Sequence, residues 1–140
     1  MIMPKTVAIL VGRLIFAGVF LMAASFKLVF MGIPATANEI AAQGIANPIV
    51  GAWLAAFLEL VLAFAFLTGL FFTDAAIVAI AYVIFLGVLF HGPNKWSGNP
   101  MEFGFFVDHF TFVAGLLFAA VHGPGDRMVL GRDYQSARRT

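Results

Sequence analysis

Residues 49–72 read IVGAWLAAFLELVLAFAFLTGLFF and contain one charged side chain, Glu59. As an α-helix this stretch would be about 36 Å long, enough to cross a hydrocarbon core of about 30 Å. Three further apolar stretches accompany it, at residues 7–30, 75–90 and 103–121. None of them alternates apolar and polar residues as the strands of a membrane barrel do. The sequence therefore predicts an all-α fold, a four-helix transmembrane bundle.

The composition of the chain supports a membrane location. Its 140 residues are 62% hydrophobic and 11% charged, against about 45–50% and about 25% in soluble domains. A small soluble domain could not bury so much apolar surface, so we expect the lipid bilayer as a partner. The formal net charge is +1 and no basic run is interleaved with aromatics, so we expect no nucleic acid. The lack of cysteine excludes disulfides, thiolate catalysis and iron–sulfur ligation by this chain.

The connection between the first two stretches predicts a short interfacial helix over residues 34–47. Thr36 and Glu39 have the spacing of a capping box, and Gly44 suits a helix end. Isoleucines at intervals give the segment an apolar side for the membrane interface.

The later connections predict turns. Thr73 or Asp74 is the expected N-cap of the third span. Residues 92–100 read GPNKWSGNP, a turn-rich loop with Trp96 expected at headgroup level. The run Gly123-Pro124-Gly125 is expected to end the fourth span.

Basic residues predict the orientation. Lys27 and Lys95 fall on one side of the membrane, and six basic residues fall on the other: Lys5, Arg13, Arg127, Arg132, Arg138 and Arg139. The positive-inside rule therefore places both termini in the cytoplasm of a multi-pass inner (plasma) membrane protein. We expect a four-span membrane domain over residues 1–125 and a basic cytoplasmic tail over residues 126–140. Because Arg13 interrupts the first apolar run, we expect a retained helix and not a cleaved signal.

Four ionisable residues lie inside the apolar runs: Arg13, Lys27, Glu59 and Asp108. Each costs about 2.5–3.5 kcal/mol at the centre of a membrane helix, and their formal charges sum to zero. We therefore predict that they face one another as an intramembrane polar cluster. Counting depth along the helices pairs Lys27 with Asp108 and lets Arg13 reach toward Glu59. Snorkelling of Lys27 to the surface stays an alternative.

Small residues flank each ionisable side chain at helical spacing, as close helix contact in membranes requires. Ala17, Phe20 and Ala24 lie on one face with Arg13 and Lys27. The other expected stripes are Ala52, Ala55, Ala56 and Ala63 around Glu59, Gly104, Thr111, Gly115 and Ala119 around Asp108, and Ala75, Ala79 and Tyr82 on the third span. The cluster is either a structural staple that fixes helix register or a site for a headgroup, a proton or a redox cofactor.

Tyr82, His109 and Thr111 are further candidate contributors to the cluster. Of the histidines, only His91 and His109 approach the matched depth that bis-histidine haem needs, and only imperfectly, so we do not expect haem. No metal site is expected. No nucleotide loop, zinc-protease helix or nucleophile elbow occurs, so the sequence predicts no autonomous catalytic motif and leaves open whether the protein is an enzyme.

Several short motifs resemble those of the DoxX family of small four-helix membrane proteins. They are Gly12-Arg13, Phe26-Lys27, the run QGIANP at residues 43–48, Leu58-Glu59-Leu60 with Gly69, and His122-Gly123-Pro124-Gly125. Ala24 stands where the family often has glycine. The resemblance implies links to terminal quinol oxidation, to thiosulfate:quinone oxidoreduction, or to a membrane complex that protects against oxidative and thiol stress. Many members have no assigned activity.

The resemblance and the polar cluster together predict a quinone-interacting or accessory subunit of a membrane oxidoreductase system. A bound quinone or partner subunits would supply the redox chemistry. Glu59 could exchange a proton with a quinol, and Phe20 or Tyr82 could contact the headgroup. Two alternatives remain: a small proton-coupled transporter with Glu59 as the coupling carboxylate, working alone or as a homo-oligomer, and a purely structural membrane subunit.

Overall fold

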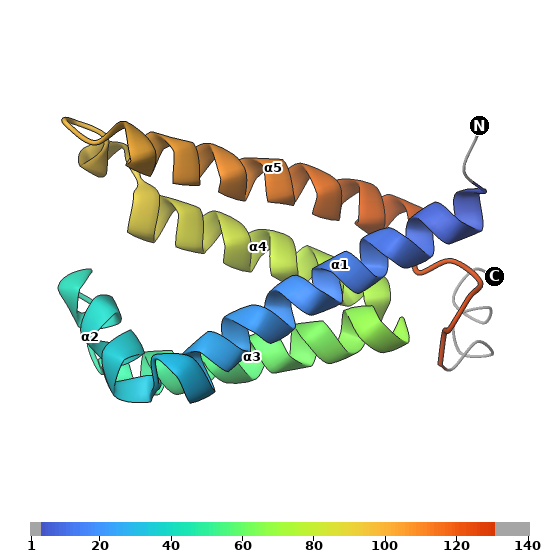
Figure 1. The fold of residues 1–140 in the computed structure, drawn as a ribbon, viewed down its shortest axis with the longest axis horizontal. Helices are drawn as coiled ribbons and strands as arrows, with labels where there is room; N and C mark the ends of the chain where they lie inside the picture. Colours follow the sequence, from blue (N-terminus) through green and yellow to red (C-terminus); the bar gives the residue numbers. More distant parts are fainter. Residues whose placement is uncertain (1–3, 131–140) are drawn as a thin grey trace. The chain divides into compact units, whose positions relative to one another are not determined.

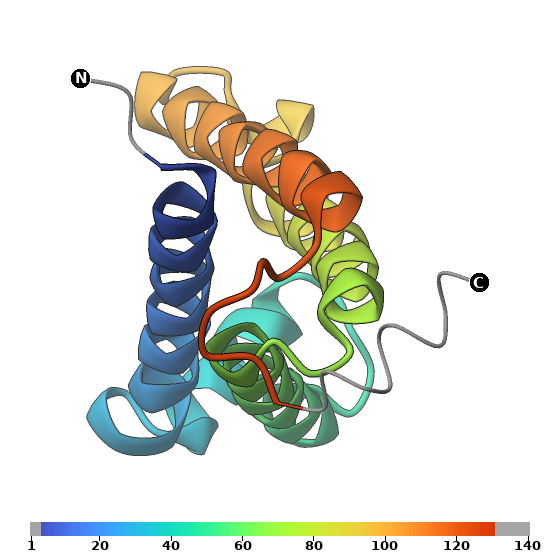
Figure 2. The same cartoon turned by 90° about the vertical axis from the view of Figure 1, so that its right-hand side faces the viewer.

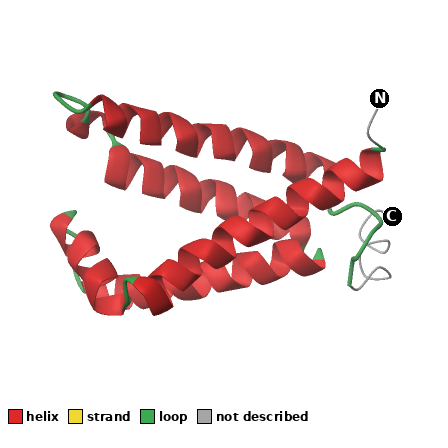
Figure 3. Cartoon of the chain, in the orientation of Figure 1, coloured by secondary structure: helices red, strands yellow, loops and turns green. Residues whose placement is uncertain are grey.

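The computed structural model describes residues 4–130, and all regular elements in that range are helical (Figures 1 and 3). The five α-helices are α1 (Lys5–Ser25), α2 (Ile33–Ala42), α3 (Pro48–Thr68), α4 (Phe72–His91) and α5 (Pro100–His122). A π-helical turn, Phe26–Phe30, continues α1, and a 3-10 turn, Pro93–Lys95, follows α4. The predicted all-α class is confirmed, as is the short helix between the first two spans.

Four of these helical segments are long and apolar enough to cross a membrane: Lys5–Phe30, Pro48–Thr68, Phe72–Lys95 and Pro100–His122. They also expose large apolar side chains, among them Trp53, Phe57 and Phe64 on α3. A soluble protein rarely leaves a contiguous apolar surface of this kind uncovered, whereas lipid covers it readily. The four predicted spans are confirmed.

The described chain divides into two compact units. Residues 4–72 and 122–130 form the first unit, and Thr73–Val121 forms the second. In the first unit α1 and α3 pack against each other and run in opposite directions, with α2 joining them (Figure 1).

Small side chains allow α1 and α3 to approach closely. Ala17 and Ala24 are buried on α1, and Ala52 and Ala56 are buried on α3. Between them Phe20 stacks on a phenylalanine of α3, Phe66, with ring centroids 5.8 Å apart and planes 3° from parallel. The predicted stripes on these two helices therefore do form the buried faces, although Ala55 is only half-buried.

The start of α2 differs from the sequence prediction. The helix begins at Ile33 after Gly32, whose φ of 86° breaks the preceding helical segment. Pro34 fits the first turn because the N–H it lacks would have no helical partner there. Thr36 is therefore inside the helix, where its hydroxyl donates to the Gly32 carbonyl at 3.2 Å, and the predicted capping box is wrong. The predicted end is confirmed, since Gly44 has a φ of 77° and its N–H bonds to the Ala41 carbonyl at 2.9 Å.

In the second unit α4 and α5 run side by side in both views (Figures 1 and 2). α4 begins at Phe72, so Thr73 and Asp74 lie in its first turn and not at the N-cap. Asp74 still stabilises the start of the helix, because its negative charge interacts favourably with the positive end of the helix dipole. A Cβ atom on Gly87 of α4 would lie only 3.0 Å from the Cβ atom of His109 on α5, so glycine permits the close approach of the two helices.

The chain leaves α5 at the expected place. α5 ends at His122, and Gly123 and Gly125 have φ angles of 74° and 76°. The following segment belongs to the first unit, where the Leu130 N–H bonds to the Thr68 carbonyl at 2.9 Å. Of the predicted basic tail, Arg127 is described, whereas three arginines lie outside the described residues: Arg132, Arg138 and Arg139.

Candidate functional site

An ion pair joins α3 to the π-helical turn that continues α1. Lys27 Nζ lies 2.8 Å from Glu59 Oε1. The Glu59 side chain is 2% exposed and that of Lys27 is 22% exposed. Glu59 sits on the buried face of α3 with Ala56 and Ala63. A charge-assisted contact of this kind offsets part of the cost of placing each ion in an apolar span.

The direction of the two helices explains why these residues meet. Side chains on an α-helix lean toward its N-terminus. Lys27 is near the end of the first span and therefore leans back along α1. Glu59 leans toward the start of α3, which in this antiparallel pair is the same end of the unit as the end of α1. The two side chains thus lean toward each other.

The π-helical turn adds to this placement. The Met31 N–H bonds to the Phe26 carbonyl at 2.8 Å, an i to i+5 contact that widens the turn carrying Lys27. Turns of this kind are uncommon and are frequently found at functional sites. Uniform α-helical periodicity gives no sign of it.

Arg13 is a buried cation of the first unit, and it donates to backbone carbonyls. The residue is 1% exposed. Its Nη1 donates to the Pro124 carbonyl at 2.9 Å and its Nη2 to the Met128 carbonyl at 2.7 Å, with a longer contact of 3.5 Å to Leu67. The Leu67 carbonyl is one of the last in α3, which have no acceptor role inside the helix. The forked guanidinium can serve several carbonyls at once because it carries five N–H donors.

Gly69 makes room for this arginine. It ends α3 in the left-handed region, with a φ of 73°. A Cβ atom at this position would lie 3.1 Å from Arg13 Nη1 and 3.2 Å from Pro124 Cβ. Glycine is needed both for the backbone conformation and for the space beside the guanidinium.

These contacts differ from the pairing that depth along the helices suggested. Lys27 meets Glu59 where Asp108 had been expected, and Arg13 turns to carbonyls where Glu59 had been expected. Depth counted from Cα positions ignores the lean of the side chains. That lean carries Arg13 away from Glu59, toward the end of α3.

The remaining sequence candidates lie on the second unit or in the packed core of the first. Asp108 and Thr111 are exposed on α5, where the Thr111 hydroxyl donates to the Val107 carbonyl at 3.1 Å. Tyr82 is half-buried on α4, and Ala75 and Ala79 of the same helix are buried. The structure thus brings Lys27 and Glu59 together within one unit, and the participation of Asp108, Tyr82, His109 and Thr111 stays a prediction.

Two histidines lie next to each other in the second unit. The ring centroids of His91 and His109 lie 5.2 Å apart. Within residues 4–130, no three or more His, Cys, Asp or Glu side chains are grouped to hold a metal ion.

Sequence reasoning missed one constellation, at the turn between α4 and α5. His91 Nδ1 lies 2.7 Å from Glu102 Oε2. Lys95 Nζ donates to the carbonyls of Leu89 and Phe90 at 2.9 and 3.0 Å, and Trp96 Nε1 donates to the His91 carbonyl at 2.8 Å. Glu102 lies between the predicted loop, residues 92–100, and the fourth apolar stretch, residues 103–121, so neither prediction included it. The sequence signal that could have indicated this contact is Glu102 at the start of the fourth span and His91 at the end of the third, joined by a short loop.

Comparison with known proteins gives one finding. The family model described as DoxX matches residues 8–92, which include Arg13, Lys27 and Glu59. No curated protein and no solved structure matches the chain.

Proposed function

We propose that this chain, which belongs to the DoxX family, is a quinone-interacting or accessory subunit of a membrane oxidoreductase system. Its family membership and its four long apolar helices make it a multi-pass membrane protein. Quinones are carried in the hydrocarbon phase, so a subunit that binds them must offer polar contacts to the headgroup at membrane depth.

The observation that carries the proposal is the Lys27–Glu59 ion pair. Ionisable groups inside membrane spans mark functional sites by default, because their insertion is costly. Here both ends of the pair are side chains, and Glu59 can change protonation state. An ammonium donates to a quinone carbonyl, and a carboxylate accepts from a quinol hydroxyl. The pair therefore offers complementary contacts to the oxidised and the reduced headgroup.

Phe20 supports the same assignment. It lies on the buried face of α1, between Arg13 and Lys27 in the sequence, and stacks on Phe66 of α3. Phe20 is seven residues before Lys27, so both lie on one helix face, and an aromatic side chain on that face suits the flat ring of a quinone.

The quinone content of the purified protein tests the proposal. Full-length protein would be extracted in mild detergent, and bound isoprenoid quinone would be quantified per polypeptide. We expect Glu59→Gln and Lys27→Met to lower the content at least tenfold. Glu39→Gln is the matched control because Glu39 is an exposed carboxylate on α2. Equal quinone in the Glu59 and Glu39 variants, or none in the wild type, would remove the proposal.

A proton-coupled transporter is the second candidate, favoured by the near-complete burial of Glu59 beside Lys27. Proteoliposomes under an imposed pH gradient distinguish the two. Solute uptake that follows the gradient and is lost in Glu59→Gln supports transport. If neither quinone nor uptake is found, and Glu59→Gln affects only folding, the pair is structural.

We propose further that the protein resides in the inner membrane with both termini in the cytoplasm. The absence of cysteine makes this directly testable. A single cysteine at Ser97, in the loop after α4, would react with a membrane-impermeant maleimide in cells whose inner membrane is intact. A single cysteine at Pro4 would react only after that membrane is permeabilised. The reverse pattern would invert the topology.

A further inference from the structure

We propose that His91, oriented by Glu102, accepts a hydrogen bond from the hydroxyl group of a hydroquinone headgroup at the turn between α4 and α5. The inference rests on the proposed function for the class of ligand. It concerns the second unit of the chain, whereas the Lys27–Glu59 pair belongs to the first.

The first step is the state of the imidazole ring. An ionised carboxylate has no hydrogen to give, so His91 Nδ1 must donate to Glu102 Oε2 across 2.7 Å. In the neutral ring, Nε2 then carries a lone pair and can only accept.

The second step is rigidity. Trp96 and Lys95 together bond the carbonyls of Leu89, Phe90 and His91, which α4 itself leaves without helical donors. Gly92 follows directly, and a Cβ atom there would lie 2.4 Å from the Val88 carbonyl oxygen. The end of α4 is thus fixed by the loop, and a binding group held in this way loses little freedom when it engages a ligand.

The third step is access and surroundings. The side chains of His91 and Glu102 are 24% and 23% exposed, so the pair is reachable. The Phe105 ring lies 5.1 Å from that of His91. His109, 5.2 Å away, donates from Nδ1 to the Phe105 carbonyl at 2.8 Å, which leaves its Nε2 as a second acceptor. Two acceptors among aromatic rings suit a flat apolar ligand that carries hydroxyl donors.

This chemistry predicts selectivity for the reduced headgroup. A hydroquinone offers O–H donors to Nε2. The oxidised quinone has only carbonyl acceptors, and the dimethyl ether of the hydroquinone has the same ring without a donor. A site built around an acceptor discriminates against ligands that lack the donor.

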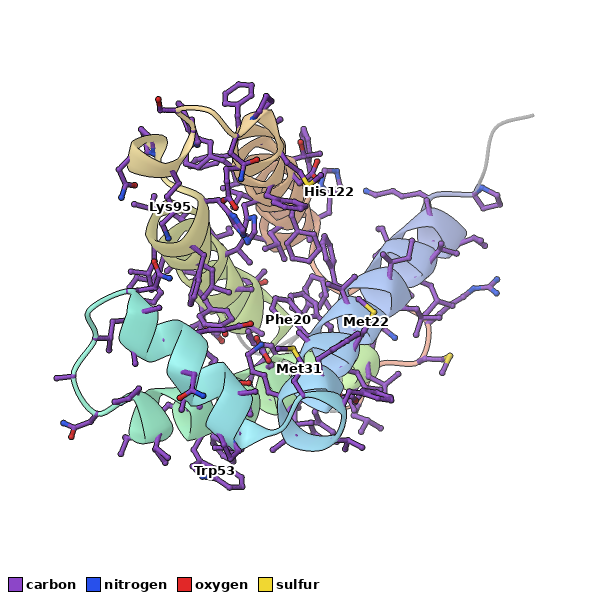
Figure 4. The ribbon with its side chains drawn as sticks, turned by 60° about the vertical axis from the view of Figure 1, so that its left-hand side comes forward. Phe20, Met22, Met31, Trp53, Lys95 and His122 are labelled. Atoms are coloured by element: carbon purple, nitrogen blue, oxygen red, sulfur yellow. The ribbon has the colours of Figure 1, made fainter. Side chains whose placement is uncertain are left out.

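Trp96 supplies the readout. The chain has two tryptophans, Trp96 and Trp53, and Trp53 is exposed on α3 (Figure 4). In a Trp53→Phe background, quenching of Trp96 fluorescence by a short-chain ubiquinol under reducing, anaerobic conditions reports binding near His91. We expect tight, saturable quenching by the hydroquinone, and only the weak linear quenching of micelle partitioning by its dimethyl ether.

Variants in the same background complete the test. We expect His91→Ala to raise Kd about tenfold or more, and Glu102→Gln to raise it severalfold because the amide keeps the contact but not the charge. His122→Ala, at the other end of α5, should leave Kd unchanged. The Trp96 bond to residue 91 is to the backbone, so an unchanged emission maximum would show that the turn remains folded. Gly87→Ala, which displaces His109, is a second perturbation should His91→Ala not fold.

The outcomes separate this site from the proposed function. If Glu59→Gln abolishes the hydroquinone response while His91→Ala leaves it intact, the His91 site is overturned and the quinone function stands. If the response depends on His91 but Glu59→Gln leaves the copurified quinone unchanged, the His91 site holds and the Lys27–Glu59 proposal fails. Equal affinity for the hydroquinone and its dimethyl ether would overturn the acceptor role of His91.

Discussion

Arg13 and Lys27, two cations of the first span, are stabilised in different ways. Arg13 donates to backbone carbonyls of Pro124 and Met128, which cannot change charge. Lys27 contacts the carboxylate of Glu59, which can. The hydrogen bonds from a guanidinium to backbone carbonyls do not depend on a second charge. The ion pair between an ammonium and a carboxylate can be broken by a proton or by a polar ligand. We infer that Arg13 has a structural role and that Lys27 and Glu59 form the binding site.

The largest expected effect is that of Arg13→Met. The substitution removes the Arg13 donors from the buried Pro124 carbonyl and the part-buried Met128 carbonyl. Hydrogen bonds to charged groups contribute about 1.5–3 kcal/mol each, so we expect a loss of roughly 3–5 kcal/mol. Thermal unfolding in detergent measures it. Because the partners of Arg13 are backbone atoms, no second side-chain substitution should restore the stability. A variant within about 1 kcal/mol of the wild type would show that the Arg13 hydrogen bonds do not stabilise the fold.

Lys27→Met should cost roughly 2–4 kcal/mol, since it leaves the buried Glu59 carboxylate without its cation. Here a rescue is expected. The double variant Lys27→Met/Glu59→Leu removes both charges and should recover most of the loss, because apolar replacement of a buried pair is often neutral. A double variant as unstable as the single one would mean that the pair is no independent unit, and the contrast with Arg13 would fail.

Gly69→Ala should cost about 1–3 kcal/mol, from the left-handed backbone and from crowding beside Arg13 Nη1. Gly18→Ala on α1 is the matched control, since a Cβ atom there meets nothing within 4 Å. The control should be neutral or slightly stabilising, because alanine favours a helix over glycine. If both variants unfold at the same temperature, the space around the guanidinium is not restricted.

Glu39→Gln gives the smallest expected effect. This carboxylate is exposed on α2, and exposed substitutions usually change stability by less than about 0.5 kcal/mol. The unfolding temperature should match that of the wild type. A loss comparable to that of Lys27→Met would show that charge removal alone, and not the buried pair, is being measured.

The sequence predicted the buried faces of the helices better than the contact partners of individual side chains. The alanine faces of α1 and α3 followed from helical spacing and are buried as expected. The partner of Lys27 did not follow, because it depends on the lean of two side chains in an antiparallel pair. The N-cap of α2 was predicted four residues late, at Thr36, because Thr36 and Glu39 fit a capping pattern that Gly32 and Pro34 pre-empt.

By itself, the sequence determined the four apolar spans, the buried stripes of α1 and α3 and the glycines that end α2 and α5. These features are local: hydrophobicity sets burial in lipid, the helix repeat sets the face, and a positive φ sets the end. The stripe predicted on α5 is wrong, because Gly104 and Thr111 are exposed and the buried residues of that helix are Val113 and Leu116. Only the tertiary structure decided that Arg13 binds the carbonyls after α5 and that Glu102 meets His91. Backbone carbonyls are present at every residue and leave no mark in the sequence. Contacts across a turn depend on where two helix ends come to lie, which no periodicity encodes.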